Sequence, residues 1–386
     1  MGLILLVAPG SRFMKLNPGD VIAERYRVDA FHLEGGMQEV YRCFDLSLDR
    51  VVALKTPREG IVDKRFSRGA QMGARVAHPN VAATLDYVEE GANRCLVEEF
   101  IEGKDLGRRL SSDFIFLDPS LSTWVVHNIA KGLQAAHKVG ICHRDLKPSN
   151  IITSANGHID IIKLTDFGIA KLAEKELEAE IELFGQDENT LTSSSTLLGA
   201  VPYLAPECWN DWSNVGQPAD IWGLGAIGCH LLLGKPPFGG GKGAIMKMAQ
   251  AQLKGHVTVS SPKWFGKHQE TNQLEQELWA IVQSCLQVDP ALRPTADEVV
   301  RRCEILCYSA TPRKTGVIEN YPMAYPNGKK AQAGFIAVDG GGTVFFHISD
   351  FFSEGEKPQV GQRVNFSLAP GKPRERCSPV LLLQNP

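Results

Sequence analysis

The feature that most constrains the fold is a change in residue pattern along the chain. In residues 20–110, short β-branched runs such as 51–54 alternate with turn residues, which is typical of a small sheet. In residues 121–307 the apolar side chains follow helical spacing. After residue 309, strands and glycine-rich turns return. This order predicts an α+β chain with a β-rich lobe, a helical lobe and a small third unit made of strands.

Length and composition are consistent with this organisation. The chain has 386 residues, which is long enough for a two-lobed domain and a compact module. Hydrophobic residues make up 43% and charged residues 22%, which excludes the collagen-like, coiled-coil and wholly disordered classes. The net charge of −3 gives no overall field that would attract nucleic acid or a membrane, so such binding must be local.

We expect four parts along the chain. Residues 1–19 are an N-terminal extension, residues 20–308 the two-lobed domain, residues 309–315 a polar linker and residues 316–386 the third unit.

The sequence predicts a cytoplasmic chain with no membrane partner. The apolar run near the N-terminus, residues 3–8, is far shorter than a membrane span and follows no basic region. The nine cysteines are odd in number, scattered and without a Cys-x-x-Cys pair, which argues against a disulfide framework or a zinc site. Reduced thiols in the cytosol are the expected state.

Two short motifs carry the chemistry, residues 143–150 (HRDLKPSN) and residues 166–168 (DFG). Both motifs resemble those of the protein kinase family, and the resemblance implies phosphoryl transfer. That reaction needs a carboxylate that orients the attacking hydroxyl and accepts its proton, and oxygen ligands that hold Mg²⁺ against the phosphates. A single acid in such a loop could equally be a capping group, but both motifs in this order favour catalysis.

These motifs resemble those of the protein kinase family, and Lys147 resembles the serine/threonine branch. The resemblance implies a bilobal kinase fold over residues 20–308 and transfer of the ATP γ-phosphate to Ser or Thr hydroxyls of a protein substrate. It implies that Asp145 is the catalytic base and that Lys147 steadies the transferred phosphoryl group. Asn150 and Asp166 would bind Mg²⁺.

The resemblance also locates the ATP site. Residues 52–55 match the strand whose lysine contacts the ATP phosphates, and residues 99–101 match the hinge beside adenine. Glu98, just before the hinge, places a charged residue at the back of the pocket. The implied ATP-binding positions are Gly35, Gly36, Val40, Ala53, Lys55, Glu99, Ile101, Asn150 and Asp166, and Lys55 is also counted among the catalytic residues.

The sequence departs from the family in three places. The phosphate-covering loop, residues 33–40 (LEGGMQEV), keeps only the middle one of its three glycines, and Ala200 replaces a threonine that bonds the catalytic loop. Gly69 lies where the family has the helix glutamate that pairs with the strand lysine, although Glu59 or Asp63 could substitute after a shift. These changes indicate a kinase of reduced or conditional activity, or alternatively a nucleotide-binding pseudokinase.

The activation segment is expected to end at residues 205–207, where Glu207 would form a structural ion pair with Arg293. Upstream, residues 190–196 are rich in Ser and Thr, in a stretch that reads as a long loop. A phosphate added there would introduce about two negative charges and could pair with Arg144. Autophosphorylation of this cluster is therefore a hypothesis for activation.

Alternating residues in the third unit separate two faces of a hairpin that spans residues 334–348. The side chains expected in its core are Ile336, Val338, Val344, Phe346 and Ile348. Phe335, Phe345 and His347 fall on the opposite face. Bases of single-stranded nucleic acid stack on exposed rings of this kind.

This hairpin, with residues 316–318 before it and 360–366 after it, resembles a bacterial cold-shock domain, which is a five-stranded OB-type β-barrel. The resemblance implies single-stranded RNA or DNA as a partner and adds Tyr321 to the candidate contacts. Asn320 replaces the tryptophan of the first strand. Seven basic against six acidic residues leave the unit almost neutral, so electrostatic attraction should be weak. The alternative is a docking or stability module.

Overall fold

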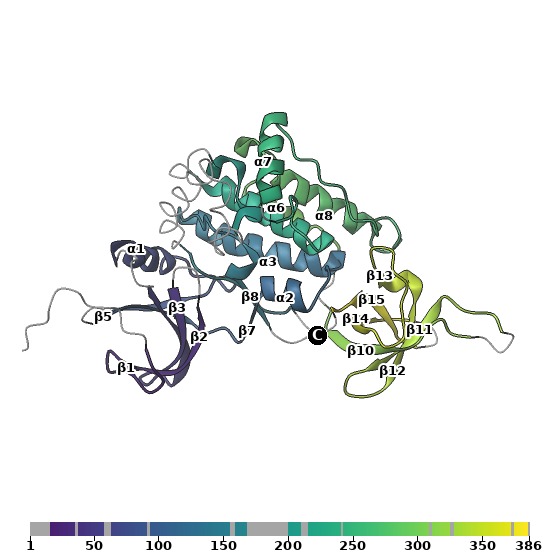
Figure 1. Ribbon diagram of the computed structural model, residues 1–386, viewed down its shortest axis with the longest axis horizontal. Coiled ribbons are helices and arrows are strands. Elements are labelled where there is room, and N and C mark those ends of the chain that lie inside the picture. Colours follow the sequence, from purple (N-terminus) through teal and green to yellow (C-terminus); the bar gives the residue numbers. More distant parts are fainter. Residues whose placement is uncertain are drawn as a thin grey trace, which may run out of the picture.

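The computed structural model describes residues 16–34, 38–57, 63–90, 93–154, 159–167, 200–209, 215–240, 242–308, 311–324, 328–371 and 374–384. Three parts follow one another along the chain in Figure 1: a purple sheet, a group of blue, teal and green helices, and a yellow β-rich unit. The helices lie between the two β-rich parts. The predicted order of a β-rich lobe and then a helical lobe is confirmed.

An antiparallel sheet forms the N-terminal lobe. Its strands are β1 (Val21–Ile22), β2 (Tyr26–Glu34), β3 (Gln38–Asp45), β4 (Arg50–Pro57), β5 (Thr84–Glu90) and β6 (Asn93–Glu99), in the order β1-β2-β3-β4-β6-β5. Helix α1 (Asp63–Gly73) packs Phe66 and Ala70 against Leu96 of β6. Because neighbouring residues of a strand face opposite ways, Cys95 and Val97 join the cluster on the other face of the sheet.

The helical lobe contains the largest buried cluster among the described residues. Its helices are α2 (Leu106–Ser112), α3 (Pro119–Lys138), α6 (Gln217–Leu233), α7 (Lys242–Lys254), α8 (Asn272–Cys285) and α9 (Ala296–Glu304). Short 3-10 turns are η1 (Pro148–Asn150), η3 (Val201–Tyr203), η4 (Pro206–Trp209) and η6 (Pro290–Leu292). A small sheet of β7 (Gly103–Asp105), β8 (Ile151–Ser154) and β9 (Ile162–Leu164) flanks the segment 139–150 that follows α3.

Helix α6 crosses the middle of this lobe, and its side chains are buried almost all round. Two glycines let α8 come close. A Cβ at Gly225 would lie 2.7 Å from Cβ of Cys285, and a Cβ at Gly228 would lie 2.6 Å from Cγ2 of Val282. This close packing fixes the first turn of α6, which carries the buried Asp220.

The C-terminal unit is a β-rich region whose sheet curls into a ring. Its elements are β10 (Arg313–Asn320), β11 (Ala333–Val338), β12 (Thr343–His347), η7 (Ile348–Asp350), β13 (Phe351–Phe352), β14 (Arg363–Ala369) and β15 (Arg376–Leu382). The order is β12-β11-β10-β14-β15-β13, and β12 also pairs with β15. The sheet thus has six strands where the resemblance implied five, because the two residues of β13 also pair with β15.

The C-terminal unit packs against the helical lobe through a buried interface. Arg313, at the start of β10, bonds to Asp118, the residue that caps the N-terminus of α3; their side chains are only 4% and 1% exposed. The ring of Phe352 stacks on His268, with centroids 3.7 Å apart. Strand β10 therefore begins inside the stretch 309–315 that we expected to be a linker, because this ion pair draws Arg313 into ordered structure.

Within the part of the chain that the structure describes, no helix is both long and apolar enough to cross a bilayer.

Candidate active site

The segment that follows α3 is held in an unusual backbone conformation by Asp220. Arg144 has a φ of +66°, in the left-handed region, which costs a non-glycine residue roughly 1–3 kcal/mol. The carboxylate of Asp220 accepts the backbone N–H groups of His143 at 2.8 Å and of Arg144 at 2.7 Å. Nε2 of His137 lies 2.8 Å from the same carboxylate. These charge-assisted bonds offset the strain and fix the position of Asp145, the next residue.

Two predicted site residues, Lys147 and Asn150, converge on Asp145. Nζ of Lys147 lies 2.8 Å from Oδ2 of Asp145. Nδ2 of Asn150 donates to the backbone oxygen of Asp145 at 2.8 Å and to its Oδ2 at 3.0 Å. The carboxylate is partly exposed, so it is oriented by two neighbours and still reachable from outside.

The same loop is tied to Asp166. Nε2 of His143 lies 2.9 Å from the backbone oxygen of Thr165, and the rings of His143 and Phe167 have centroids 4.6 Å apart. Asp166 itself has a φ of +65°, again left-handed. The structure therefore brings the two sequence motifs together, while Gly168 lies outside the described residues.

Lys55 on β4 connects the N-terminal lobe to Asp166. Its Nζ lies 2.7 Å from Oδ1 of Asp166 and 2.5 Å from Oε2 of Glu98 on β6. Nε2 of Gln38, on β3, donates to Oδ1 of Asp166 at 2.7 Å. One oxygen of Asp166 therefore receives two bonds from the N-terminal lobe.

The pKa values in this cluster follow from burial and from the shared charge of Lys55. Burial disfavours the ammonium group, but Asp166 and Glu98 outweigh burial and raise the pKa of Lys55 above its ordinary value. Burial raises the pKa of Glu98, and Lys55 reverses only part of that shift. For Asp166 the effect of burial is exceeded by Lys55 and Gln38, so its pKa is lowered. Asp166 is thus the carboxylate most firmly held in its charged form.

The other described ATP-binding positions that the resemblance implies lie on β3, on β4 and at or just beyond the end of β6. Val40 and Ala53 are buried on β3 and β4, and Ile101 is half-buried beyond the end of β6. Oε2 of Glu99 accepts a hydrogen bond from Nζ of Lys163 at 2.8 Å. The backbone N–H of Glu99 donates to the backbone oxygen of Ala83 at 2.9 Å. Gly35 and Gly36 lie outside the described residues.

Asn150 and Asp166 supply oxygen donors of the kind that Mg²⁺ prefers. The amide nitrogen of Asn150 is bound to Asp145, so its oxygen Oδ1 is the amide atom left to act as a ligand. Asp166 is held in its charged form. One carboxylate and one amide oxygen, completed by substrate phosphates, fit the way proteins bind this ion. No group of three or more His, Cys, Asp or Glu side chains suited to a metal occurs among the described residues.

The missing helix glutamate is the clearest departure from the expected site. Gly69 is buried on α1. Of the two proposed substitutes, Glu59 lies outside the described residues. Asp63 is the first residue of α1, and its side chain is not among those that the structure describes. Besides Asp166, the acid in contact with the strand lysine is Glu98. The unusual charge at position 98 is evident from the sequence, but its contact with Lys55 was not predicted, and neither was the contact of Gln38 with Asp166.

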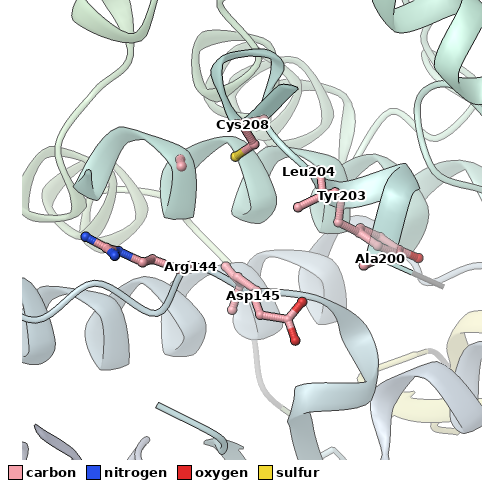
Figure 2. Close-up of a pocket in the computed structure, with 9 residues that line it drawn as sticks. Arg144, Asp145, Ala200, Tyr203, Leu204 and Cys208 are labelled. Carbon is pink, nitrogen blue, oxygen red and sulfur yellow. The ribbon is translucent and has the colours of Figure 1, made fainter. Parts of the chain in front are cut away.

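A small pocket lies beside Asp145. Its lining includes Ala200, Tyr203, Leu204 and Cys208. In Figure 2 the side chains of Arg144 and Asp145 point in different directions from the loop, and Ala200 lies on the same side as the Asp145 carboxylate. The methyl group at position 200 thus stands where the resemblance implied a hydroxyl.

The predicted structural ion pair is confirmed. Nη1 and Nη2 of Arg293 donate to the two carboxylate oxygens of Glu207 at 2.6 and 2.7 Å. Arg293 is buried, and its guanidinium lies 5.0 Å from the ring centre of Trp222 on α6. The pair anchors η4 to the core of the helical lobe.

Comparison with known proteins agrees with this geometry. Residues 34–303 match the family model of the protein kinase domain. The chain belongs to the protein kinase family. Its similar relatives include the probable serine/threonine-protein kinase PknB of Lactococcus lactis, which is 33% identical over 61% of this chain and 35% of that protein.

Other relatives of the kinase domain are also bacterial. The serine/threonine-protein kinase pkn3 of Myxococcus xanthus is 34% identical over 57% of this chain and 40% of that protein. The serine/threonine-protein kinase PrkC of Bacillus subtilis is 31% identical over 64% of this chain and 36% of that protein. The chain thus spans well under half the length of these three relatives.

Beyond the kinase domain, two of the four candidate nucleic-acid residues lie together. Phe335 and Phe345 are opposite each other on β11 and β12, half-buried, with ring centroids 5.9 Å apart in an edge-to-face arrangement. Nδ1 of His347 accepts the N–H of Ser349 and so caps η7. The ring of Tyr321 packs on the buried Phe346, which belongs to the core.

Proposed function

We propose that this chain transfers the γ-phosphate of ATP to Ser or Thr hydroxyls of a protein substrate. The observation that carries the proposal is the convergence of Lys147 and Asn150 on the carboxylate of Asp145, in a loop bonded to the segment that holds Asp166. The substrate hydroxyl oxygen attacks the γ-phosphorus while Asp145 accepts the hydroxyl proton. The bond to the β–γ bridging oxygen breaks, and ADP leaves.

The charges around the cleft have distinct tasks in this reaction. Lys147 stabilises the negative charge of the phosphoryl group while it passes from ADP to the hydroxyl oxygen, and Lys55 neutralises phosphate charge from the side of the N-terminal lobe. Asn150 and Asp166 would hold Mg²⁺, which neutralises the phosphates when bound. The space for the adenine ring is framed by Val40, Ala53, Glu99 and Ile101. We propose that the backbone of Gly35 and Gly36 covers the phosphates.

The direct test is transfer of labelled γ-phosphate from Mg-ATP to the protein itself and to a basic protein substrate. Asp145→Asn keeps the size and the hydrogen bonds of the side chain but loses the proton acceptor, so we expect at least a hundredfold loss of transfer. Glu304→Gln, an exposed change on α9, is the matched control. Equal transfer by the wild type and Asp145→Asn would reject the proposal.

A nucleotide-binding pseudokinase is the second candidate. The observation that favours it is that both Lys55 and Gln38 bond to Asp166, the carboxylate needed for the metal. In this case Mg-ATP raises the melting temperature but no labelled phosphate is transferred. The same preparation therefore distinguishes the two functions.

We also propose that the enzyme phosphorylates its own segment 190–196 and that Arg144 receives a phosphate placed there. That segment lies outside the described residues, and the argument rests on its hydroxyl side chains and on the direction of Arg144 away from Asp145 (Figure 2). Incubation with Mg-ATP should add mass in multiples of one phosphate to the peptide that contains residues 190–196. No mass gain on that peptide from an enzyme that phosphorylates another substrate would contradict the idea.

For the C-terminal unit we propose a cold-shock-like module that binds single-stranded RNA or DNA. The supporting observation is the pair Phe335 and Phe345, two half-buried rings side by side on β11 and β12. A base that stacks on such a ring gains about 1–3 kcal/mol, so Phe345→Ala should weaken oligonucleotide binding about fivefold or more. Fluorescence anisotropy with a labelled single strand measures this, and absence of binding by the wild type would favour a docking module.

A further inference from the structure

Glu98 is a buried carboxylate that the proposed reaction leaves without a task. It lies on β6, its side chain is only 8% exposed, and its Oε2 is 2.5 Å from Nζ of Lys55, whose side chain is 7% exposed. A charged group so far from water is retained only where it is paired. The pair therefore needs an explanation in terms of what Lys55 does.

The contact is built into the register of two neighbouring strands. Glu98 is directly opposite Ala53 in the antiparallel pair β4–β6. Lys55 follows two residues later on β4, so it faces the same side of the sheet as Ala53 and is the diagonal neighbour of Glu98. The distance between the two charges is thus set by backbone hydrogen bonds and not by a loop or a separate helix.

The second partner of Lys55 cannot hold it throughout the reaction. Asp166 is the carboxylate proposed to bind the metal, and its Oδ1 now accepts from both Lys55 and Gln38. When that carboxylate turns to a divalent ion, its share in fixing Lys55 falls. Glu98 has no such competing duty and keeps the lysine in place.

Helix α1 offers no described carboxylate for this purpose. Position 69 is glycine, and the described side chains that α1 packs on the sheet are Phe66 and Ala70, which contact Leu96. The inward surface of the helix at this point is therefore apolar.

We propose that Glu98 is the positioning residue of Lys55, a carboxylate supplied by the sheet itself that aims the ammonium group at the ATP phosphates. The inference rests on the proposed function, because it assigns Lys55 to the phosphates. In this role Glu98 acts through Lys55.

A double-mutant cycle tests this dependence. Glu98→Gln keeps the shape and removes the charge, Lys55→Met removes the ammonium, and the two are combined. We expect Glu98→Gln to lower kcat/KM for ATP at least tenfold in the wild-type background and less than twofold in the Lys55→Met background. Glu89→Gln, an exposed acid on the adjacent strand β5, should leave kcat/KM unchanged. Equal losses in both backgrounds, or no loss in the first, would overturn the inference.

Two further measurements keep the test decisive. If Glu98→Gln does not fold, Glu98→Asp retains the charge but withdraws it by one methylene, and an unchanged kcat/KM in that variant would also reject the role. If the wild type transfers no phosphate, the proposed catalytic function fails. The same cycle is then measured as Kd for Mg-ATP by calorimetry, where coupling between positions 55 and 98 supports the positioning role and its absence refutes it.

Discussion

The buried ion pair between Arg313 and Asp118 should dominate the attachment of the C-terminal unit. Breaking a buried pair from one side typically costs about 3–5 kcal/mol, because the remaining charge is left without a partner. Here Asp118 also accepts N–H groups from the first turn of α3, at 3.0 and 3.2 Å. A helix N-terminus stabilises a carboxylate by up to about 1 kcal/mol, so we expect Arg313→Met to lower the free energy of unfolding by about 2–4 kcal/mol.

The chain supplies a matched control for that experiment. Arg363 pairs with Asp339 at 2.6 Å, but the two side chains are 37% and 45% exposed. Exposed pairs contribute about 0–1 kcal/mol, so Arg363→Met should change stability little. Both variants are measured by urea denaturation of the full chain, followed by circular dichroism and tryptophan fluorescence.

A double variant tests the same ion pair a second time. Asp118→Asn combined with Arg313→Met removes both charges while asparagine still caps α3. This double variant should recover most of the stability that Arg313→Met loses. Equal effects of Arg313→Met and Arg363→Met, or a double variant no more stable than Arg313→Met, would refute the argument from buried charge.

Four other outcomes follow from the site and the core. Gln38→Gly removes one bond from Asp166, the carboxylate proposed to bind the metal, and should lower Kd for Mg-ATP several-fold by calorimetry, whereas weaker binding would mean that the amide helps to hold nucleotide. Ala200→Thr restores a hydroxyl beside Asp145 and should raise the rate of phosphate transfer, whereas an unchanged rate would show that this hydroxyl is dispensable. Cys307 is exposed, while burial raises the pKa of the Cys142 thiol to about 11. Iodoacetamide at pH 8 should therefore label Cys307 before Cys142, as followed by peptide mass spectrometry, and faster labelling of Cys142 would contradict its burial. Burial lowers the pKa of His230 to about 4, so between pH 6.5 and 4 the unfolded chain binds a proton that the folded chain excludes. Stability to urea should therefore fall as the pH drops from 6.5 to 4, and a stability that does not change with pH would contradict this expectation.

Local motifs allowed much of the site to be predicted from sequence. Asp145, Lys147 and Asn150 lie within six residues of one another, so a short loop is enough to bring them together. The ion pair of Glu207 with Arg293 spans 86 residues, yet it was also predicted, because the family resemblance supplies the fold that joins them.

The contacts that escaped prediction depend on details of pairing that residue patterns do not encode. The contact of Glu98 with Lys55 follows from the register of β6 on β4, and a shift of one residue would turn the side chain to the other face. Gln38 reaches Asp166 across 128 residues and two lobes. Arg313 meets Asp118 across 195 residues, so the polar stretch that contains it looked like a linker.

The placement of Glu98 on the same sheet as Lys55 bears on which movements of the protein can change the contacts of Lys55. Both members of the Lys55–Glu98 pair belong to one sheet, so rotation of α1 would leave that pair intact. Lys55 and Gln38 reach Asp166 from the N-terminal lobe, so their bonds to this carboxylate depend on how the two lobes lie against each other. We therefore expect movement of the lobes relative to each other, and not rotation of α1, to change the contacts of Lys55 and Gln38 with Asp166. An inhibitor that separates the lobes should disturb these contacts more than one that displaces the helix.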